Sequence, residues 1–499
     1  MRYVVCLAVT AAVLTTASRT IEAQHHTVRA GTEFTRIFRD LPAFAPPSDR
    51  IRAALVELGR KGGPMDAADN LAAGPIELIV NPALNSNNPN SASHTAGATF
   101  IGQFFDHDMT FDTSSRLGQP THPRTAPNTR RPFFDLDSVY GHGPSGSPLL
   151  YEPADRAKFR VEHGGLFEDL PRDANGTAII ADPRNDENLV ISGLQVAFLL
   201  FHNAMVDRVR NHEPGWSTEE VFDEARRLTT SHYQWLLVHE FLPQFVGNAT
   251  VNDVLAHGGR FYPTRDTEGT IPVEFQMAYR FGHSLVRPSY RANFTGNGGT
   301  AFFAMLFDGG QPAGAEPTDL RGGARGSRRF IGWHTFFAVP GFESDSRPNK
   351  RIDTKLSTPL FELPLGAIAS GLPPISLAER NLLRHLTWSL PSGQAIAAAM
   401  GGPVLPDSAF AELKAIEPAF VSSTPLWYYV LREADVLANG ETLGPIGGRL
   451  VAEVFIGLLR SDDKSILNQS PPFVPTLGAA PGAFTMIDFL RVAGVDQKR

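Results

Sequence analysis

The stretch "ENLVISGLQVAFLLFHNAMVDRVRNH", residues 187–212, decides the class of fold. Its apolar residues recur at helical spacing and cover nearly the whole circumference near its middle, which is typical of a helix buried in a large core. The next segment, "STEEVFDEARRLTTSHYQWLLVHEFL" at 217–242, opens with Ser217 and Glu220 at the spacing of a capping box. Two long helices in direct succession predict a mainly α protein.

A third helix is predicted over "PVEFQMAYRFGHSLV", 272–286, and is closed by Pro288. Strand signals are few, whereas Pro and Gly are abundant between the helical segments, which predicts long irregular loops. The chain of 499 residues can hold a large core, and no internal repeat or linker divides it. We therefore expect one large α-rich domain over 24–499 with little β structure.

Charge indicates little about partners. The net charge is -7 and the pI is near 6.1, so the chain has neither the basic stripe of a nucleic-acid-binding protein nor an acidic tail. One local exception is "RGGARGSRR", 321–329, which we expect to be a solvated loop because Gly-rich charged runs usually stay exposed.

The N-terminus, "MRYVVCLAVTAAVLTTASRTIEAQ", has the layout of a secretory signal: Arg2, an apolar run and a polar end at Ala23. We expect residues 1–23 to be a signal peptide and the protein to be secreted or periplasmic. The apolar run is short for a bilayer span, so a stable membrane anchor is not expected. Cys6, the single cysteine, lies in this segment, which excludes disulfides and thiolate chemistry in the mature chain.

A second informative stretch is "FIGQFFDHDMTFD", 100–112, where three ionisable groups stand side by side among apolar residues. If the segment is helical, Asp106, His107 and Asp108 diverge by about 100° per residue and cannot share one pocket. Two solvated carboxylates with an incidental histidine are one reading. The flanking phenylalanines favour the other, in which each group is buried and has its own partner or metal.

Asp108 has a candidate partner in "RRPFFDLDSVYG", 130–141, where Asp135 and Asp137 point the same way if the chain is extended. Carboxylates joined by loop carbonyls suit a hard cation such as calcium, which takes six to eight oxygen ligands. Solvated loop acids are an equally common explanation of a D-x-D pattern.

Five segments together resemble the animal-type haem peroxidase family of the peroxidase-cyclooxygenase superfamily, in its bacterial branch. They stand in the family's order, and the resemblance implies a myeloperoxidase-like, mainly α fold and a haem peroxidase activity. The segments are "GQFFDHD" at 102–108, "RPFFDLDSVYG" at 131–141, "DPRNDENL" at 182–189, "YRFGHSLVRP" at 279–288 and "AERNLLR" at 378–384.

The resemblance implies three catalytic residues on the distal side of a haem b group. His107 would be the base that takes a proton from hydrogen peroxide and returns it to the departing oxygen. Gln103, one helical turn earlier, would hold a water or halide, and Arg184 would stabilise the charge that develops as the O–O bond breaks. A surface ion pair is the commoner role of an isolated arginine.

The resemblance also implies how haem is held. His283 would ligate the haem iron through one ring nitrogen, with Asn381 accepting a hydrogen bond from the other and Arg280 pairing with a propionate. Asp106 and Glu187 match two carboxylates that are ester-linked to haem in mammalian members. Either an ester or protonation makes the burial of these carboxylates against haem reasonable.

For calcium, the resemblance implies a site built from Asp108, Asp135 and Asp137 with the carbonyls of Arg131 and Phe133. Arg131 replaces the family's usual threonine, so a hydroxyl ligand is lost and weaker calcium binding is expected. Asn188 stands where one mammalian member has a haem-linked methionine, so that sulfonium link is impossible and strong chloride oxidation is not expected.

The partners expected are hydrogen peroxide and a small electron donor: a halide, pseudohalide or phenol. The alternatives are a haem fatty-acid dioxygenase, a calcium-stabilised binding protein and a zinc hydrolase, which would lack H-E-x-x-H. Fatty-acid dioxygenases carry a radical tyrosine three residues before the proximal histidine, and here Arg280 stands there. Tyr279 is one residue earlier, so we expect it to point about 100° away from substrate as a packed aromatic. The oligomeric state is left open by the sequence.

Overall fold

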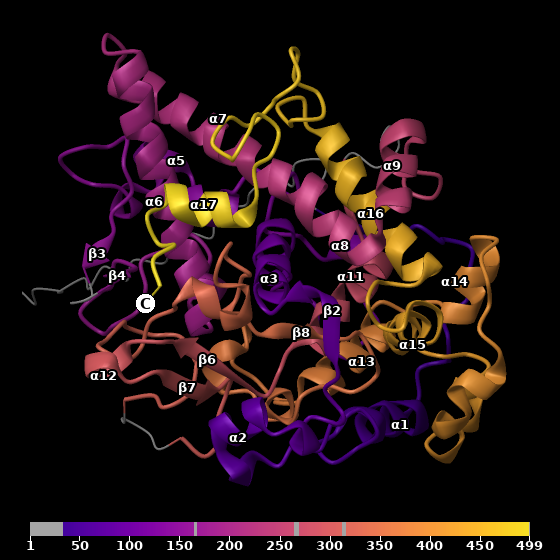
Figure 1. The fold of residues 1–499 in the computed structure, drawn as a ribbon. Coiled ribbons are helices and arrows are strands. Elements are labelled where there is room, and N and C mark those ends of the chain that lie inside the picture. Colours follow the sequence, from indigo (N-terminus) through magenta and orange to yellow (C-terminus); the bar gives the residue numbers. More distant parts are fainter. Residues whose placement is uncertain (1–32, 164–166, 264–268, 312–315, 499) are drawn as a thin grey trace, which may run out of the picture.

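The computed structural model describes residues 33–163, 167–263, 269–311 and 316–498, and the predicted signal peptide at 1–23 lies outside them. Two long helices, α6 (Leu189–His212) and α7 (Thr218–Leu236), run side by side, and α3 (Gly97–Met109) lies in the middle of the molecule (Figure 1). The mainly α fold predicted from the sequence is confirmed.

The remaining elements are short and joined by long loops. The other α-helices are α1 (Asp49–Gly59), α2 (Gly74–Val80), α4 (Asp137–Tyr140), α5 (Gly143–Gly146), α8 (Leu242–Val246), α9 (Asn248–His257), α11 (Val273–Tyr279), α12 (Gly296–Gly299), α13 (Leu377–Thr387), α14 (Gly393–Ala399), α15 (Leu426–Ala438), α16 (Pro445–Ser461) and α17 (Met486–Val492).

The β structure of the described residues consists of four two-stranded sheets. One pair is parallel and three are antiparallel, so no extended sheet organises this part of the chain. The pairs are β1 (Phe34–Thr35) with β5 (Ile271–Pro272), β2 (Asn90–Thr95) with β8 (Pro348–Lys350), β3 (Glu162–His163) with β4 (Glu168–Asp169), and β6 (Ser289–Asn293) with β7 (Phe302–Met305).

The two long helices begin at polar caps. The side chain of Asn188 accepts hydrogen bonds from the first backbone N–H groups of α6. Ser217 and Glu220 form the predicted capping box at the start of α7. The predicted helix over 217–242 does not continue as one α-helix, because Pro243 cannot donate its backbone N–H. A π-helical turn, Leu237–Phe241, leads instead into α8.

The predicted helix at 272–286 also changes form. It is α-helical only over α11 and tightens to a 3₁₀-helix over Arg280–Leu285, the segment that carries His283. Gly282 lies within the tightened segment, and glycine is a poor residue for an α-helix interior. A 3₁₀ stretch following an α-helix often marks a functional segment.

Helix α6 is long and apolar enough to cross a bilayer by length and composition alone, but 83% of its most apolar window is buried inside the protein. This extent of burial is typical of the core helix of a globular protein. Buried apolar side chains from Phe34 to Val495 form one connected core cluster around it.

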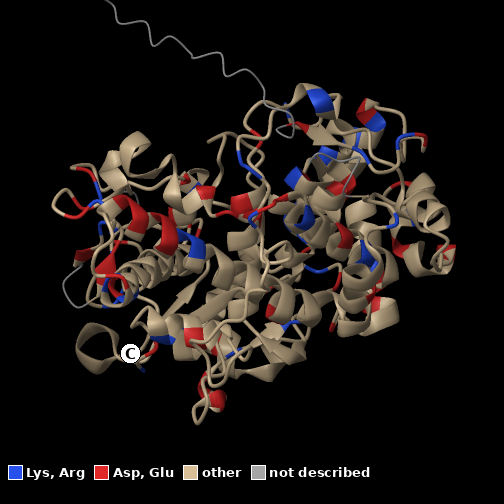
Figure 2. Ribbon diagram, turned by 90° about the horizontal axis from the view of Figure 1, so that it is seen from above, with Lys and Arg blue, Asp and Glu red and all other residues tan. Residues whose placement is uncertain are grey.

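The segment 321–329 is not the solvated loop that we expected. Arg329 is buried and donates hydrogen bonds to four backbone carbonyls, including those of Asp319 and Arg321. The arginines at these positions satisfy carbonyl groups that irregular backbone leaves without partners. Elsewhere, basic and acidic residues are intermixed over the described part of the chain, in keeping with its small net charge (Figure 2).

Candidate active site

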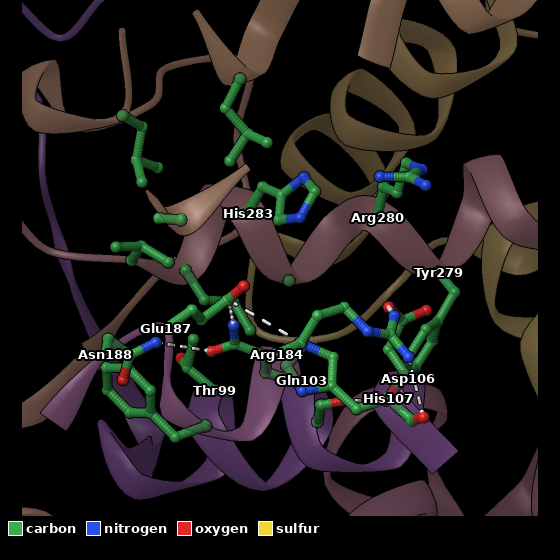
Figure 3. Close-up of a pocket in the computed structure, with 18 of the residues that line it drawn as sticks. Thr99, Gln103, Asp106, His107, Arg184, Glu187, Asn188, Tyr279, Arg280 and His283 are labelled. Carbon is green, nitrogen blue, oxygen red and sulfur yellow. Dashed lines mark hydrogen bonds and ion pairs between the residues drawn. The ribbon is translucent and has the colours of Figure 1, made fainter. Parts of the chain in front are cut away.

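A cavity of about 250 Å³ separates α3 from the segment formed by α11 and its 3₁₀ extension. His107 lies on the α3 wall and His283 on the opposite wall (Figure 3). The 3₁₀ turn Pro183–Asp186 completes the first wall and α13 forms one edge. Five predicted site residues besides the two histidines line this cavity: Gln103, Asp106, Arg184, Glu187 and Arg280.

The protonation of His107 is determined by Asn185. The Nδ1 atom of His107 lies 2.8 Å from Oδ1 of Asn185, while the Asn185 amide nitrogen donates to Gln195 at 2.8 Å. The Asn185 oxygen can only accept, so Nδ1 carries the proton and Nε2 is left as the basic nitrogen. Asn185 was missed in the sequence, although it lies in the quoted "DPRNDENL" segment.

His107 is 4% exposed, and this burial, together with the nearby Arg184 guanidinium, lowers its pKa to about 4. The imidazole is therefore neutral at neutral pH. A general base must be unprotonated before it acts, so this environment provides the required form of the ring.

Arg184 is held rigidly at the wall of the cavity. Its Nε and Nη2 atoms donate to both carboxylate oxygens of Asp182, at 3.0 and 2.8 Å. Nη2 also donates to the carbonyl of His107 at 2.9 Å, which ties the arginine to α3. The remaining nitrogen, Nη1, lies 3.9 Å from Asp106. Asp182 offsets the positive charge of Arg184. Arg184 therefore acts in the cavity mainly as a hydrogen-bond donor in a fixed position, and less as a free cation.

Gln103 and the two predicted ester-forming acids line the same wall. Gln103 donates to Glu187 through Nε2 and accepts from Asn188 at 3.3 Å through Oε1 (Figure 3). Burial raises the pKa of Glu187 to about 8, so this carboxyl group is mostly protonated at neutral pH. The Asp106 side chain is 41% exposed, so the two acids have different environments.

The structure brings His283, Asn381 and Arg280 together, with one difference from the expected arrangement. Asn381 offers its amide nitrogen, not its oxygen, to Nδ1 of His283 at 2.7 Å. Its oxygen accepts from Nη1 of Arg280 at 3.1 Å. The expectation that Asn381 accepts from His283 is therefore wrong for this arrangement, because an arginine can only donate and so takes the oxygen.

Two further arginines were missed in the sequence. Arg380 and Arg384 on α13 line the cavity, and their charges contribute to lowering the pKa of Arg280 to about 10, after the larger effect of its burial. Their spacing around Asn381 in "AERNLLR" was the available signal, since i, i+3 and i+4 positions share a helix face. The Nε atom of Arg280 is buried without a hydrogen-bond partner among the described residues.

These features fit haem. A flat apolar macrocycle with two propionates needs an axial base on one face, room on the other and cations at one edge. Burial lowers the pKa of His283 to about 3, so its imidazole is neutral. Ligation through Nε2 would need the ring proton on Nδ1, and the Asn381 oxygen is the acceptor available to it once the amide turns. The partnerless Arg280 nitrogen, beside Arg380 and Arg384, supplies donors at one edge of the cavity for carboxylates that the protein itself does not provide.

Tyr279 also lines the cavity, and its hydroxyl group donates to the carbonyl of Gly102 at 2.7 Å (Figure 3). Our expectation that it points away from the site is wrong. Tyr279 lies four residues before His283, and positions i and i+4 share one face of a helix. The shift of one residue relative to Arg280 does not remove the phenol from this face.

The prediction that the three neighbouring groups at the end of α3 cannot share one pocket is only partly right. His107 and Asp106 both line the cavity, with Asp106 beside Arg184. Asp108 is fully buried on another side, where it accepts from the backbone of Leu136 at 3.0 Å and from the hydroxyl of Ser138 at 2.7 Å.

Asp108, Asp135 and Asp137 form the acidic cluster that the resemblance implies for calcium. One carboxylate oxygen of each lies within 4.8 Å of the others. Burial is the largest cause that raises the pKa of each carboxyl, and repulsion from Asp137 acts in the same direction on Asp108 and Asp135. Three such groups held together without a cation are costly, so the cluster fits a bound divalent ion.

The loop before the cluster differs from the extended chain that we expected. Phe134 and Leu136 have φ values of 54° and 59°, in the left-handed region, and this turn brings Asp135 and Asp137 together. The guanidinium of Arg131 pairs with Asp135, while its backbone N–H donates to Asp137 at 3.0 Å. Arg131 stands at the position of the missing threonine, and its guanidinium therefore competes with calcium for the carboxylate of Asp135. Ser138, not predicted as a site residue, joins the cluster through Asp108.

Two neutral histidines lie on opposite walls of an arginine-edged cavity in a helical fold, an arrangement that fits a haem site. A family model described as animal haem peroxidase matches residues 111–302. Over these residues the chain is similar to the animal haem peroxidase family.

Curated relatives match shorter segments. A dual oxidase from Drosophila melanogaster is 31% identical over 111 residues, which cover 22% of this chain and 7% of that protein. Human eosinophil peroxidase is 26% identical over 145 residues, 26% of this chain and 20% of the relative. The first three relatives are covered over 7–35% of their own length.

Solved structures share the fold over most of the chain. Peroxidase A from Dictyostelium discoideum superposes with a TM-score of 0.57 at 15% identity, over 94% of this chain and 95% of that chain. A fatty acid alpha-dioxygenase from Oryza sativa, solved with palmitic acid, also gives a TM-score of 0.57, at 14% identity over 84% and 77% of the two chains. At these identities the likeness shows the fold alone.

Proposed function

We propose that the protein is a haem peroxidase that reduces hydrogen peroxide and oxidises a small donor: a halide, pseudohalide or phenol. The observation that carries the proposal is the pair of neutral histidines on opposite walls of one cavity, with the distal tautomer determined by Asn185. Haem, when bound, supplies the iron at which the O–O bond of the peroxide is cleaved.

The role of His107 is to move a proton between the two peroxide oxygens. Its Nε2 atom takes the proton from one oxygen and returns it to the departing oxygen as water. The hydrogen bond from Nδ1 to Asn185 keeps the other nitrogen protonated throughout, so that only Nε2 is available as the base. The lowered pKa of His107 keeps this nitrogen unprotonated before peroxide arrives.

Arg184 and Gln103 position and stabilise the reacting group. Arg184 cannot turn away from the cavity because Asp182 holds two of its nitrogens, so Nη1 is the donor left to the departing oxygen. Gln103, held between Glu187 and Asn188, has little freedom and can orient a water or halide.

On the other wall His283 would ligate the iron through Nε2, which places the ring proton on Nδ1. The Asn381 amide would then turn its oxygen from Arg280 to this N–H and so orient the ring. Arg280, Arg380 and Arg384 would bind the propionates. We further propose that Glu187 and Asp106 can form ester bonds to haem. The mostly protonated state of Glu187 supports this, since an ester is likewise uncharged. An acid–acetone extraction that removes haem fully from the wild-type protein would exclude the covalent bonds.

Two proposals concern the rest of the chain. The acidic cluster of Asp108, Asp135 and Asp137 supports a calcium site, in which backbone carbonyls of 131 and 133 would complete the ligand set. The layout of residues 1–23 supports export to the periplasm or the medium.

The peroxidase proposal is tested with the full chain purified with haem. We expect a Soret band and peroxide-dependent oxidation of iodide, bromide or guaiacol. The variant His107→Ala should retain the band and lose at least about 100-fold in peroxide reduction, the usual scale for loss of a general acid–base group. Purified protein without a Soret band after haem supplementation would contradict the proposal.

A fatty-acid dioxygenase is the second candidate, and Tyr279 is the observation that favours it. Its phenol lines the haem cavity, which also has an apolar part formed by Leu306, Phe307, Leu360 and Leu363. We favour the peroxidase because the Tyr279 hydroxyl is engaged with Gly102 and the residue is only 7% exposed.

A further inference from the structure

A second cavity, of about 190 Å³, lies beside α3 and shares only Ala98 and Phe241 with the haem cavity. The Phe241 ring packs against Gly102, where an added Cβ atom would meet it at 3.0 Å. The wall between the two cavities is therefore about one side chain thick. The second cavity takes no part in the chemistry proposed above.

One buried atom in its lining is unsatisfied. His94, on β2, is 6% exposed, and its Nε2 atom lies 2.9 Å from the carbonyl oxygen of Glu441. A carbonyl can only accept, so Nε2 carries the proton. Burial lowers the pKa of His94, which keeps the ring neutral. Its Nδ1 atom is thus a lone-pair acceptor, and it has no partner among the described residues. Such a group calls for a donor.

Ser93 and Thr95 of β2 also line the cavity, and two further polar groups come from the π-helical turn and α8. Glu240 accepts from the backbone N–H of Met486 at 2.7 Å through one oxygen. Burial raises its pKa to about 7, so its carboxyl group is only partly ionised near neutral pH. Gln244 lines the cavity, and its amide makes no hydrogen bond to the described residues. π-Helical turns occur frequently at functional sites.

Apart from Ser93 and Thr95, the rest of the lining is apolar and suits a flat ring. Phe337, Met486 and Ile101 lie around the cavity with Leu236 and Ile487. Aromatic and thioether side chains make favourable contacts with aromatic rings. A cation would lose its hydration here with only a partly ionised carboxyl to replace it, and a carboxylate would find no positively charged side chain in the lining.

We propose that this second cavity binds a small phenol, whose hydroxyl group donates to Nδ1 of His94 while its ring packs between Phe337 and Met486. The site is separate from the haem cavity, and its occupation does not depend on peroxide chemistry. An apolar pocket with a few convergent polar groups is the usual form of a small-molecule site.

The test uses ¹⁹F NMR titrations of the haem-loaded full chain with 4-fluorophenol, 4-fluorotoluene and 4-fluorobenzylamine. We expect 4-fluorophenol to bind at least about tenfold more tightly than either other probe. The toluene has no hydrogen-bond donor for His94, and the benzylamine is a cation that would lose its hydration in the cavity. It should also shift the ¹³C-methyl resonance of Met486, assigned with Met486→Leu. Equal affinities for the three probes would overturn the proposal.

Variants localise the binding. His94→Phe should reduce the affinity for 4-fluorophenol at least about tenfold and leave 4-fluorotoluene nearly unchanged. Ala338→Leu, which fills the cavity without touching its polar groups, should weaken both probes. The matched controls are Ala324→Leu, at an exposed position outside the cavity, and His257→Phe, on the surface. If Ala338→Leu leaves the affinity for 4-fluorophenol unchanged and the phenol does not shift the Met486 methyl resonance, the phenol binds elsewhere and the proposed site is refuted.

Discussion

The Nδ1 atom of His107 lies 2.8 Å from Oδ1 of Asn185, and this contact determines which nitrogen of the distal histidine is basic. We expect Asn185→Leu to allow either tautomer and to slow peroxide reduction by roughly 10- to 100-fold, the usual scale for loss of a group that orients a functional histidine. Haem content should not change. Stopped-flow measurement of peroxide reduction tests this, with Asn175→Leu on an exposed loop as the control. If Asn185→Leu reduces peroxide at the wild-type rate, Asn185 has no role in the reaction.

The rate of peroxide reduction should depend on pH through His107. Burial lowers its pKa to about 4, and the base acts only when unprotonated, so the rate should stay constant as the pH falls through 6.5 and decline only near pH 4. In His107→Ala this acidic limb should disappear along with most of the activity. An acidic limb centred at pH 6.5 in the wild-type enzyme would show that the imidazole is not shielded from water.

Loss of His283 should affect haem before it affects the fold. We expect His283→Ala to be purified with little haem, or with a shifted Soret band, because the iron loses its protein ligand. The ratio of Soret to protein absorbance measures this. His257→Ala is the control, since that histidine lies on the surface with a side chain that is 71% exposed. A spectrum identical to that of wild type would refute the axial assignment.

Removal of calcium should loosen both the loop at 131–137 and the end of α3, since Asp108 is adjacent to His107. We expect chelation to lower the melting temperature and the turnover together. Arg131→Thr should strengthen calcium binding by roughly tenfold, because the guanidinium that pairs with Asp135 is removed. Calorimetric titration of the apoprotein measures the affinity. Full activity and unchanged melting after chelation would contradict the site.

Tyr279 separates the two candidate reactions. We expect no oxygen uptake with linoleate or arachidonate after a trace of peroxide, because the phenol hydrogen is committed to the Gly102 carbonyl. Tyr279→Phe should therefore leave peroxide-dependent iodide oxidation within about twofold of wild type, since the phenol has no role in proton transfer at His107. An oxygen electrode measures the oxygen uptake. Rapid uptake with a polyunsaturated fatty acid, abolished in Tyr279→Phe, would favour the dioxygenase.

Local signals in the sequence were sufficient for the helices. The capping box at Ser217 and the apolar circumference of 187–212 depend on spacing along one helix, which sequence order determines directly. The same geometry separated Asp108 from His107, but it did not separate Asp106, which lines the same cavity as His107. It also contained the position of Tyr279, which we misjudged by counting one residue of rotation and not the four that separate it from His283.

Other features depended on contacts between segments far apart in the chain. The tautomer of His107 is determined by Asn185, 78 residues away, and the orientation of Asn381 by Arg280, 101 residues away. The burial of Arg329 follows from carbonyl groups in an irregular loop, a context that composition does not reveal. The sequence by itself therefore indicated both histidines and several of their neighbours in the cavity, through the order of motifs in the family that it resembles, but not Arg380 or Arg384. Only the tertiary structure decided their protonation and hydrogen-bond direction, because these depend on which donors and acceptors are buried together.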